Sequence, residues 1–348
     1  MAYATFNKPS LYFNTKLYSG DGGTQSVTGV GFQPDWSWLK CRSTAYHHRL
    51  FDVVRGAGKN LRSDTTNAEQ TIDEGITAFN SDGFSVKQGS DLEYNATGQT
   101  YVAWNWKANG AASNNNNNDG QQYSTVSVNT TAGFSIVSYT GTGSNTNYGH
   151  GLGVAPKMII IKNRSIDENW ATYHASLGNA NNVLLNGTNA SVSTSDYNST
   201  SPTSSVFYVG SGSGTNGNGN NMIAYCFAEK KGFSKFGSYT GNGNSDGVFV
   251  YTGFKPAFII FKRTSGTGNW QLIDNKRIGF NVDNYTLYPN STIVDQDEND
   301  ADILSNGFKL RGSGTDGNGS GSTYIYMAFA EEPLVANVGT NGVPATAR

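Results

Sequence analysis

The chain repeats one pattern of apolar and polar residues three times. An apolar stretch begins at a proline and ends at a lysine six residues later, over residues 34–40, 156–162 and 256–262. Fourteen residues after the proline comes Trp170 in the second copy and Trp270 in the third, and His48 takes that place in the first. The identical spacing predicts that one structural unit occurs three times.

Each copy of the pattern predicts strands and turns rather than helices. Apolar and polar residues alternate, β-branched and aromatic residues are frequent, and Gly, Asn or Asp punctuates them. A Tyr-Ser/Thr-Gly turn opens each copy, at residues 18–22, 139–143 and 239–243. The stretch from proline to lysine is apolar at nearly every position, which is typical of a strand covered on both faces. We therefore predict an all-β fold of three tandem antiparallel β-sandwiches, each of about 100 residues.

The repeat and the composition together predict the domain boundaries. The first and most divergent sandwich is expected at residues 1–110, the second at 126–232 and the third at 233–333. Residues 111–125 include a run of asparagines with nothing to bury, which predicts a linker. The second and third sandwiches abut, so we expect a rigid pair with the first more loosely attached. Residues 334–348 are expected to form an arm that pairs with a neighbour or is disordered.

Composition excludes several classes of partner. Only 14% of the residues are charged and the net charge is −2, whereas soluble proteins carry about 25% charged residues. A nearly neutral surface argues against nucleic acid, which requires a basic face. The sequence contains no apolar stretch long enough for a membrane span. Membrane and nucleic-acid partners are therefore not expected.

The N-terminal residues and the two cysteines predict where the protein is made and where it works. No signal peptide is recognised at residues 1–7. Cys41 and Cys226 lie at non-equivalent places in different copies, so both are expected to be reduced and buried. We expect synthesis in a cytoplasm, yet the Asn-, Gly- and Thr-rich surface is typical of proteins that work outside cells. Virus particles satisfy both conditions.

Several motifs of the repeat carry a resemblance to a known family. They are the Tyr-Thr-Gly-x-Gly turn, the Pro-x-x-Ile-Ile-x-Lys strand, the Asn-Trp pairs at 169–170 and 269–270, and the closing Phe-Ala-Glu at 227–229 and 329–331. Together they resemble a repeated domain of tailed bacteriophages, especially marine ones, whose proteins are tail fibres or virion structural proteins. The resemblance implies a lectin-like jelly-roll sandwich, a place on the particle and no catalytic residues. The first copy departs from it, with Trp-Asn-Trp-Lys at residues 104–107.

Two glycine-rich patterns that enzymes share occur in loops. Residues 243–247 match the nucleophile pattern of serine hydrolases, and residues 212–217 and 312–317 match a dinucleotide fingerprint. Both patterns need a strand followed by a helix. Strands are predicted on both sides here, so we interpret these residues as turns, and no cofactor is expected.

One acidic run offers a weak candidate for a calcium site. Asp295, Asp297 and Asn299 supply alternate oxygen ligands, as the first positions of a calcium loop do. The glycine and the glutamate that such a loop needs further on are replaced by Asp300 and Asn306. A solvated acidic loop and a calcium site both remain open.

Candidate ligand-binding residues lie in two places. Tyr148, His150 and Asn244 belong to opening loops that differ in length and composition between copies, and variable loops commonly carry binding functions. Trp170 and Trp270 could be platforms on which a sugar ring stacks, or they could belong to the sandwich core. Their repetition favours the core, because every copy needs a core.

The leading hypothesis is a non-enzymatic virion protein, a tail fibre or a capsid decoration that binds a host surface glycan. Its expected partners are other virion proteins and further copies of itself, as a trimer or as many copies on a particle. One alternative is an architectural protein that binds virion proteins alone. Another is a secreted glycan-degrading enzyme, which the absence of a recognisable pair of catalytic carboxylates disfavours.

Overall fold

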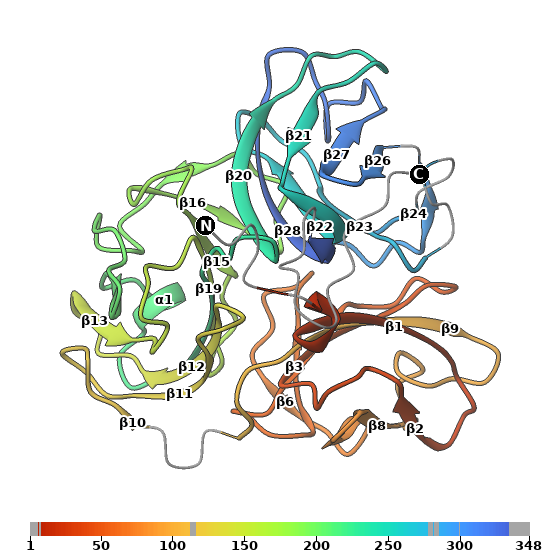
Figure 1. Cartoon of the computed structure of the whole chain (residues 1–348). Helices are drawn as coiled ribbons and strands as arrows, with labels where there is room; N and C mark the ends of the chain where they lie inside the picture. Colours follow the sequence, from red (N-terminus) through yellow and green to blue (C-terminus); the bar gives the residue numbers. More distant parts are fainter. Residues whose placement is uncertain are drawn as a thin grey trace.

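The computed structural model describes Phe6 and residues 8–111, 116–277, 281, 285–298 and 300–333. The fold is all-β with antiparallel sheets, so the predicted fold class is confirmed at that level. The short helical pieces are η1 (Pro9–Leu11) and α1 (Ser213–Asn216). Strands fall into three groups along the chain, and the groups meet at the centre of the molecule (Figure 1). We call residues 8–111, 116–232 and 233–333 the first, second and third segments.

The first segment contains two sheets that enclose a core. The larger has the order β1-β9-β3-β4-β5-β6 and the smaller the order β2-β8-β7. Leu39 and Ala103 of the larger sheet pack with Val27 and Phe84 of the smaller. The strands are β1 (Phe13–Ser19), β2 (Thr24–Thr28), β3 (Trp36–Cys41), β4 (Arg49–Asp52), β5 (Lys59–Arg62), β6 (Gln70–Thr71), β7 (Gly75–Asn80), β8 (Gly83–Lys87) and β9 (Thr100–Trp106).

The second segment has a large sheet of order β10-β11-β12-β19-β14-β15-β16-β17 and a small one of β13 and β18. Its strand β10 lies inside the predicted linker and pairs with β11. The strands are β10 (Asn116–Asn117), β11 (Ser124–Asn129), β12 (Phe134–Thr140), β13 (Thr146–Gly149), β14 (Met158–Asn163), β15 (Ala171–His174), β16 (Asn181–Leu184), β17 (Val192–Ser193), β18 (Val206–Val209) and β19 (Asn221–Phe227).

The third segment has sheets of order β20-β28-β22-β23, β21-β27-β26 and β24-β25. Its strand β22, like β3 and β14, lies between the closing strand of its segment and the strand that follows it in sequence. The strands are β20 (Ser234–Thr240), β21 (Phe249–Tyr251), β22 (Phe254–Arg263), β23 (Trp270–Asp274), β24 (Tyr285–Thr286), β25 (Gln296–Asp297), β26 (Ala301–Leu304), β27 (Gly307–Leu310) and β28 (Thr323–Pro333).

The strands that run from proline to lysine are buried on both faces, as predicted. Alternate residues of β14 face different cores, because side chains of a strand point to opposite sides. Ile159 and Ile161 pack within the second segment. Met158 and Ile160 pack into a second core, to which all three segments contribute.

We call this second core the common core. Aromatic rings from the three large sheets fill it; Trp36 stacks on Tyr225 with centroids 4.4 Å apart, and Phe13 stacks on Phe329 at 5.2 Å. Its members include Phe13, Trp36, Trp38, Trp104 and Trp106 of the first segment, Phe134, Met158, Ile160, Trp170, Tyr225 and Phe227 of the second, and Phe233, Phe236, Phe258, Ile260, Trp270 and Phe329 of the third. The expectation of a loosely attached first segment is therefore wrong, since its tryptophans lie in the common core.

The lysine that ends each apolar stretch joins two segments. Lys40 donates to the carbonyl oxygen of Thr292 at 3.1 Å, and Lys162 to that of Thr66 at 2.9 Å. Lys262 donates to the carbonyl oxygen of Thr188 at 3.0 Å. Burial lowers the pKa of all three amines to about 8. The three contacts run from third to second, second to first and first to third segment, so they close a ring.

Candidate functional site

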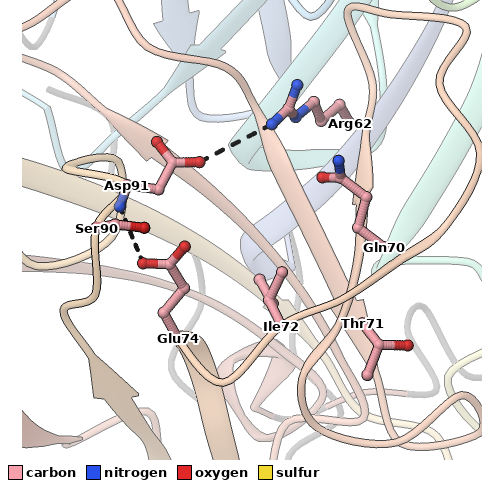
Figure 2. Close-up of a pocket in the computed structure, with 7 residues that line it drawn as sticks. All are labelled: Arg62, Gln70, Thr71, Ile72, Glu74, Ser90 and Asp91. Atoms are coloured by element: carbon pink, nitrogen blue, oxygen red, sulfur yellow. Dashed lines mark hydrogen bonds and ion pairs between the residues drawn. The ribbon is translucent and has the colours of Figure 1, made fainter.

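A polar pocket of about 560 Å³ opens on the first segment. Figure 2 shows charged and amide side chains converging on it from β5, from β6 and from the turns beside β7 and β8. Its lining residues are Arg62, Gln70, Thr71, Ile72, Glu74, Ser90 and Asp91.

The second segment helps to position the wall that carries Arg62. Strand β6 pairs with β5, so that Gln70 lies opposite Asn60. At the end of β5, the Arg62 carbonyl oxygen accepts a hydrogen bond of 2.7 Å from Nε1 of Trp170. Trp170 therefore fixes the backbone at one edge of the pocket from the neighbouring segment.

The two carboxylates of the pocket are held by the protein itself. Asp91 Oδ2 accepts a hydrogen bond of 2.6 Å from Arg49 Nη2 and lies 3.9 Å from Arg62 Nη2. Glu74 Oε2 accepts from the backbone N–H of Asp91 at 3.1 Å. Arg49 also pairs with Glu93, so it bridges two acidic side chains. The carboxylates are thus fixed before any ligand binds, which lowers the entropy cost of binding.

The pocket is suited to a ligand with many hydroxyl groups. Carboxylate oxygens of Glu74 and Asp91 accept hydrogen bonds, the guanidinium of Arg62 donates them, and the amide of Gln70 can do both. Ile72 adds an apolar patch, as binding pockets with a few convergent polar groups commonly do. Because Arg49 already binds Asp91, this carboxylate is poorly placed to act as a free nucleophile.

Tyr148 and His150 lie in the interior rather than at a binding surface. Both are 0% exposed. The Tyr148 hydroxyl donates to the carbonyl oxygen of Thr140 at 2.7 Å. His150 Nδ1 accepts from the backbone N–H of Leu152 at 3.1 Å, and burial lowers the pKa of this imidazole. Both side chains hold loops of the second segment, so their prediction as ligand contacts is not supported by their placement.

Asn244 is exposed, but its loop is fixed from below by a buried asparagine. Asn318 is 1% exposed, accepts from the backbone N–H of Asn242 at 3.0 Å and donates to the carbonyl oxygen of Asn244 at 2.8 Å. Asn216 makes the corresponding contact to Thr142 in the second segment. These two asparagines were not predicted from the sequence, although their place in the glycine-rich loops was a signal.

Trp170 and Trp270 are core residues, as their repetition suggested. They are 0% and 1% exposed, so neither presents a ring face to a sugar. Trp270 Nε1 donates to the carbonyl oxygen of Leu184 at 2.8 Å, across to the second segment. His48, in the same place of the first segment, contacts the backbone of Tyr288 in the third. These residues connect segments instead of binding ligand.

The acidic run of the third segment does not form a calcium site in the described residues. Asp295 accepts from Arg42 at 2.7 Å and from Arg277 at 2.8 Å, so two guanidinium groups occupy its oxygens. Asp297 is exposed in β25, and Asn299 lies outside the described residues. Within the described part of the chain, no group of three His, Cys, Asp or Glu side chains could hold a metal.

The expectation for the two cysteines agrees with the structure. Cys41 and Cys226 are buried free thiols, as predicted. In the part of the chain that the structure describes, no helix has the length and apolarity to cross a membrane. The residues of the polar pocket were not predicted, because they come from separate strands and turns without a motif.

A comparison with models of protein families identifies the family of the chain. A family model described as a domain of unknown function, DUF7483, matches residues 8–333, so the chain belongs to this family. No curated protein matches the chain. The single model spans all three segments, as does the common core.

Proposed function

We propose that the protein is a non-enzymatic structural protein of a bacteriophage particle, a tail fibre or capsid decoration that binds a host surface glycan. The polar pocket of the first segment carries the glycan part of this proposal. Arg62, Glu74 and Asp91 offer fixed donors and acceptors to sugar hydroxyls in a surface with little charge. The motif resemblance and the nearly neutral surface support a place on the virion.

The same proposal includes the finer fold, three tandem lectin-like jelly-roll β-sandwiches. Its support is the shared placement of β3, β14 and β22, each between a closing strand and the next strand in sequence. The ring of lysine contacts adds to it, because each lysine reaches from one segment to the next.

Binding to host polysaccharide tests the pocket. Arg62→Ala removes its guanidinium and Gln70→Ala its exposed amide, so both variants should bind the polysaccharide more weakly than the parent. Gln122→Ala removes an equally exposed amide from the second segment and should bind like the parent. Equal binding by all variants, with unchanged melting temperatures, would reject the pocket. Absence of binding by the parent would favour the purely architectural alternative.

Two further measurements test the remaining parts. Mass spectrometry and antibody labelling of purified particles should locate the protein on the virion. Release of reducing sugars from host polysaccharide by the parent protein would show an enzyme instead, with Glu74 and Asp91 as the first residues to replace.

Assembly with other copies, as a trimer or as many copies on a particle, belongs to the proposal as well. The tail at residues 334–348, predicted to pair with a neighbour, lies outside the described residues. A chain that ends at residue 333 should keep its fold and assemble less well in light scattering. A monomeric parent with unchanged particle incorporation of the truncated chain would contradict this part.

A further inference from the structure

Each pair of segments meets at a junction of the same design. At each junction a backbone N–H of one segment donates a hydrogen bond to a backbone carbonyl oxygen of the next segment. The accepting residue lies two positions after the repeated lysine of that next segment. Glu69 donates to Arg164 at 2.9 Å, Asp295 to Arg42 at 3.2 Å and Ser191 to Thr264 at 3.0 Å. The three junctions are therefore comparable residue by residue. We name them by their segments as the first/second, third/first and second/third junctions.

The first/second junction contains a network of four charged groups, two of them fully buried and two partly buried. Asp52 pairs with Arg55, which reaches Glu69 at 3.3 Å, and Glu69 also accepts from Arg164 at 2.8 Å. Tyr225 completes the network by donating its hydroxyl to Asp52 at 2.8 Å.

The third/first junction repeats this network with other residues. Asp274 pairs with Arg277 at 2.7 Å, Arg277 reaches Asp295 at 2.8 Å, and Asp295 accepts from Arg42 at 2.7 Å. Here Trp104 Nε1 donates to Asp274 at 2.9 Å, in the role of the tyrosine hydroxyl.

The second/third junction has none of these four charged groups. The corresponding residues are His174, Leu177, Ser191 and Thr264. His174 Nε2 bonds to the carbonyl oxygen of Tyr326 at 3.1 Å, and burial lowers the pKa of the imidazole to about 4, which keeps it neutral. Short side chains thus stand where guanidinium and carboxylate groups fill the other two junctions.

A cavity of about 400 Å³ lies at this junction and is lined by Leu177, Ser191 and Thr264. Four further residues with hydroxyl groups, Ser176, Ser238, Ser265 and Thr323, line it and are exposed. Within the described part of the chain, the side-chain hydroxyls of Ser176 and Ser238 make no hydrogen bond. None of the described lining residues carries a charge.

We propose that this cavity is a binding site for a neutral saccharide or another uncharged polyol. Hydroxyl groups both donate and accept, so they match the hydroxyls of a sugar without selecting for an ion. Leu177 supplies an apolar surface for the carbon face of the ring. This site is separate from the charged pocket of the first segment and does not rest on the proposed function.

The test is saturation-transfer NMR of the full chain with glucose, galactose, mannose and N-acetylglucosamine. The double variant Ser191→Glu and Thr264→Arg introduces the pair that Glu69 and Arg164 form, so it should fill the cavity. Combined with Gln70→Ala, which weakens the charged pocket, it should abolish the transfer to the bound sugar. Ser238→Trp, at an exposed position on the rim, should do the same by obstruction. Gln70→Ala, in the other pocket, should keep the signal.

Two results would overturn the inference. One is a parent protein that shows no transfer to any of the four sugars. The other is a signal that survives undiminished when the double variant, or Ser238→Trp, is combined with Gln70→Ala, which would place the sugar elsewhere. Loss of the signal in Gln70→Ala alone would assign the binding to the first segment, so failure here is distinguishable from failure of the proposed function.

Discussion

The first/second and third/first junctions are filled by guanidinium and carboxylate groups, whereas the second/third junction is built from neutral side chains around a cavity. All three nevertheless keep the same backbone hydrogen bond and the same lysine contact. The backbone and the common core therefore set the arrangement of the segments. Two junctions carry additional charged groups and one lacks them. This agrees with the small net contribution that many buried ion pairs make to stability.

Removing one charge from a charged junction should have the largest effect. Arg277→Leu leaves Asp274 buried without its partner, which should lower the free energy of unfolding by about 3–5 kcal/mol. Leu177→Met, at the corresponding place of the neutral junction, is a conservative exchange and should change it by less than about 1.5 kcal/mol. Urea unfolding of both variants measures the difference. Equal small changes would mean that the network contributes nothing that the neutral junction lacks.

Acid should weaken the neutral junction at a higher pH than the third/first junction. The folded protein keeps His174 neutral down to a pKa of about 4, while the unfolded chain takes up a proton below about 6.5. Stability is therefore lost as pH falls through this window, by roughly 3 kcal/mol in total. Burial alone would raise the pKa of Asp274, but Arg277 holds it below its ordinary value, so its contribution persists until pH falls below about 3.8.

His174→Asn is the matched variant for this pH dependence. Burial also lowers the pKa of His48 and His150, and both remain in parent and variant. Unfolding measured from pH 7 to pH 4 should show a flatter profile for His174→Asn. Parallel profiles would contradict the assignment to His174.

Trp170 and Trp270 each donate a hydrogen bond to a neighbouring segment, so the same substitution can be compared at a charged junction and at the neutral one. The expected effects on stability are smaller than those above. Trp270→Phe removes the donor to Leu184 at the neutral junction, and Trp170→Phe removes the donor to Arg62 at a charged one. Each change removes one hydrogen bond between two segments and should reduce stability by about 0.5–1.5 kcal/mol. Trp170→Phe should also weaken polysaccharide binding, since Trp170 holds the edge of the polar pocket. Unaltered binding by this variant would separate the tryptophan from the pocket.

Installing an ion pair in the neutral junction should have the smallest effect on stability. Ser191→Glu with Thr264→Arg should change the free energy of unfolding by less than about 1 kcal/mol, because partly exposed pairs contribute little. Thermal unfolding of the double variant checks this. A loss of several kcal/mol would show that the cavity cannot accept the side chains that the first/second junction accommodates.

The proline-to-lysine strands show how far the sequence could be interpreted. Their uninterrupted apolar pattern correctly predicted burial on both faces, as in β14. One of the two faces packs into a core that no single segment provides, since Met158 and Ile160 face the common core. An uninterrupted apolar strand indicates that both of its faces are covered, but it does not indicate what covers them.

The polar pocket could not be predicted for a related reason. Arg62, Glu74 and Asp91 are separated along the chain, and the turn of Asp91 meets Glu74 only after β7 and β8 have paired. Tyr148 and His150 were chosen for loop variability, and their burial was not visible in the sequence.

The ring of lysine contacts raises the effective concentration at which the two faces of the second/third junction meet. Because the first segment contacts both of the others, it tethers the two faces of the second/third junction at a short distance. Faces that are tethered in this way meet at an effective concentration in the millimolar range even if their own affinity is low. The second/third junction can therefore remain hollow while the contacts of the first segment with the other two keep its walls together.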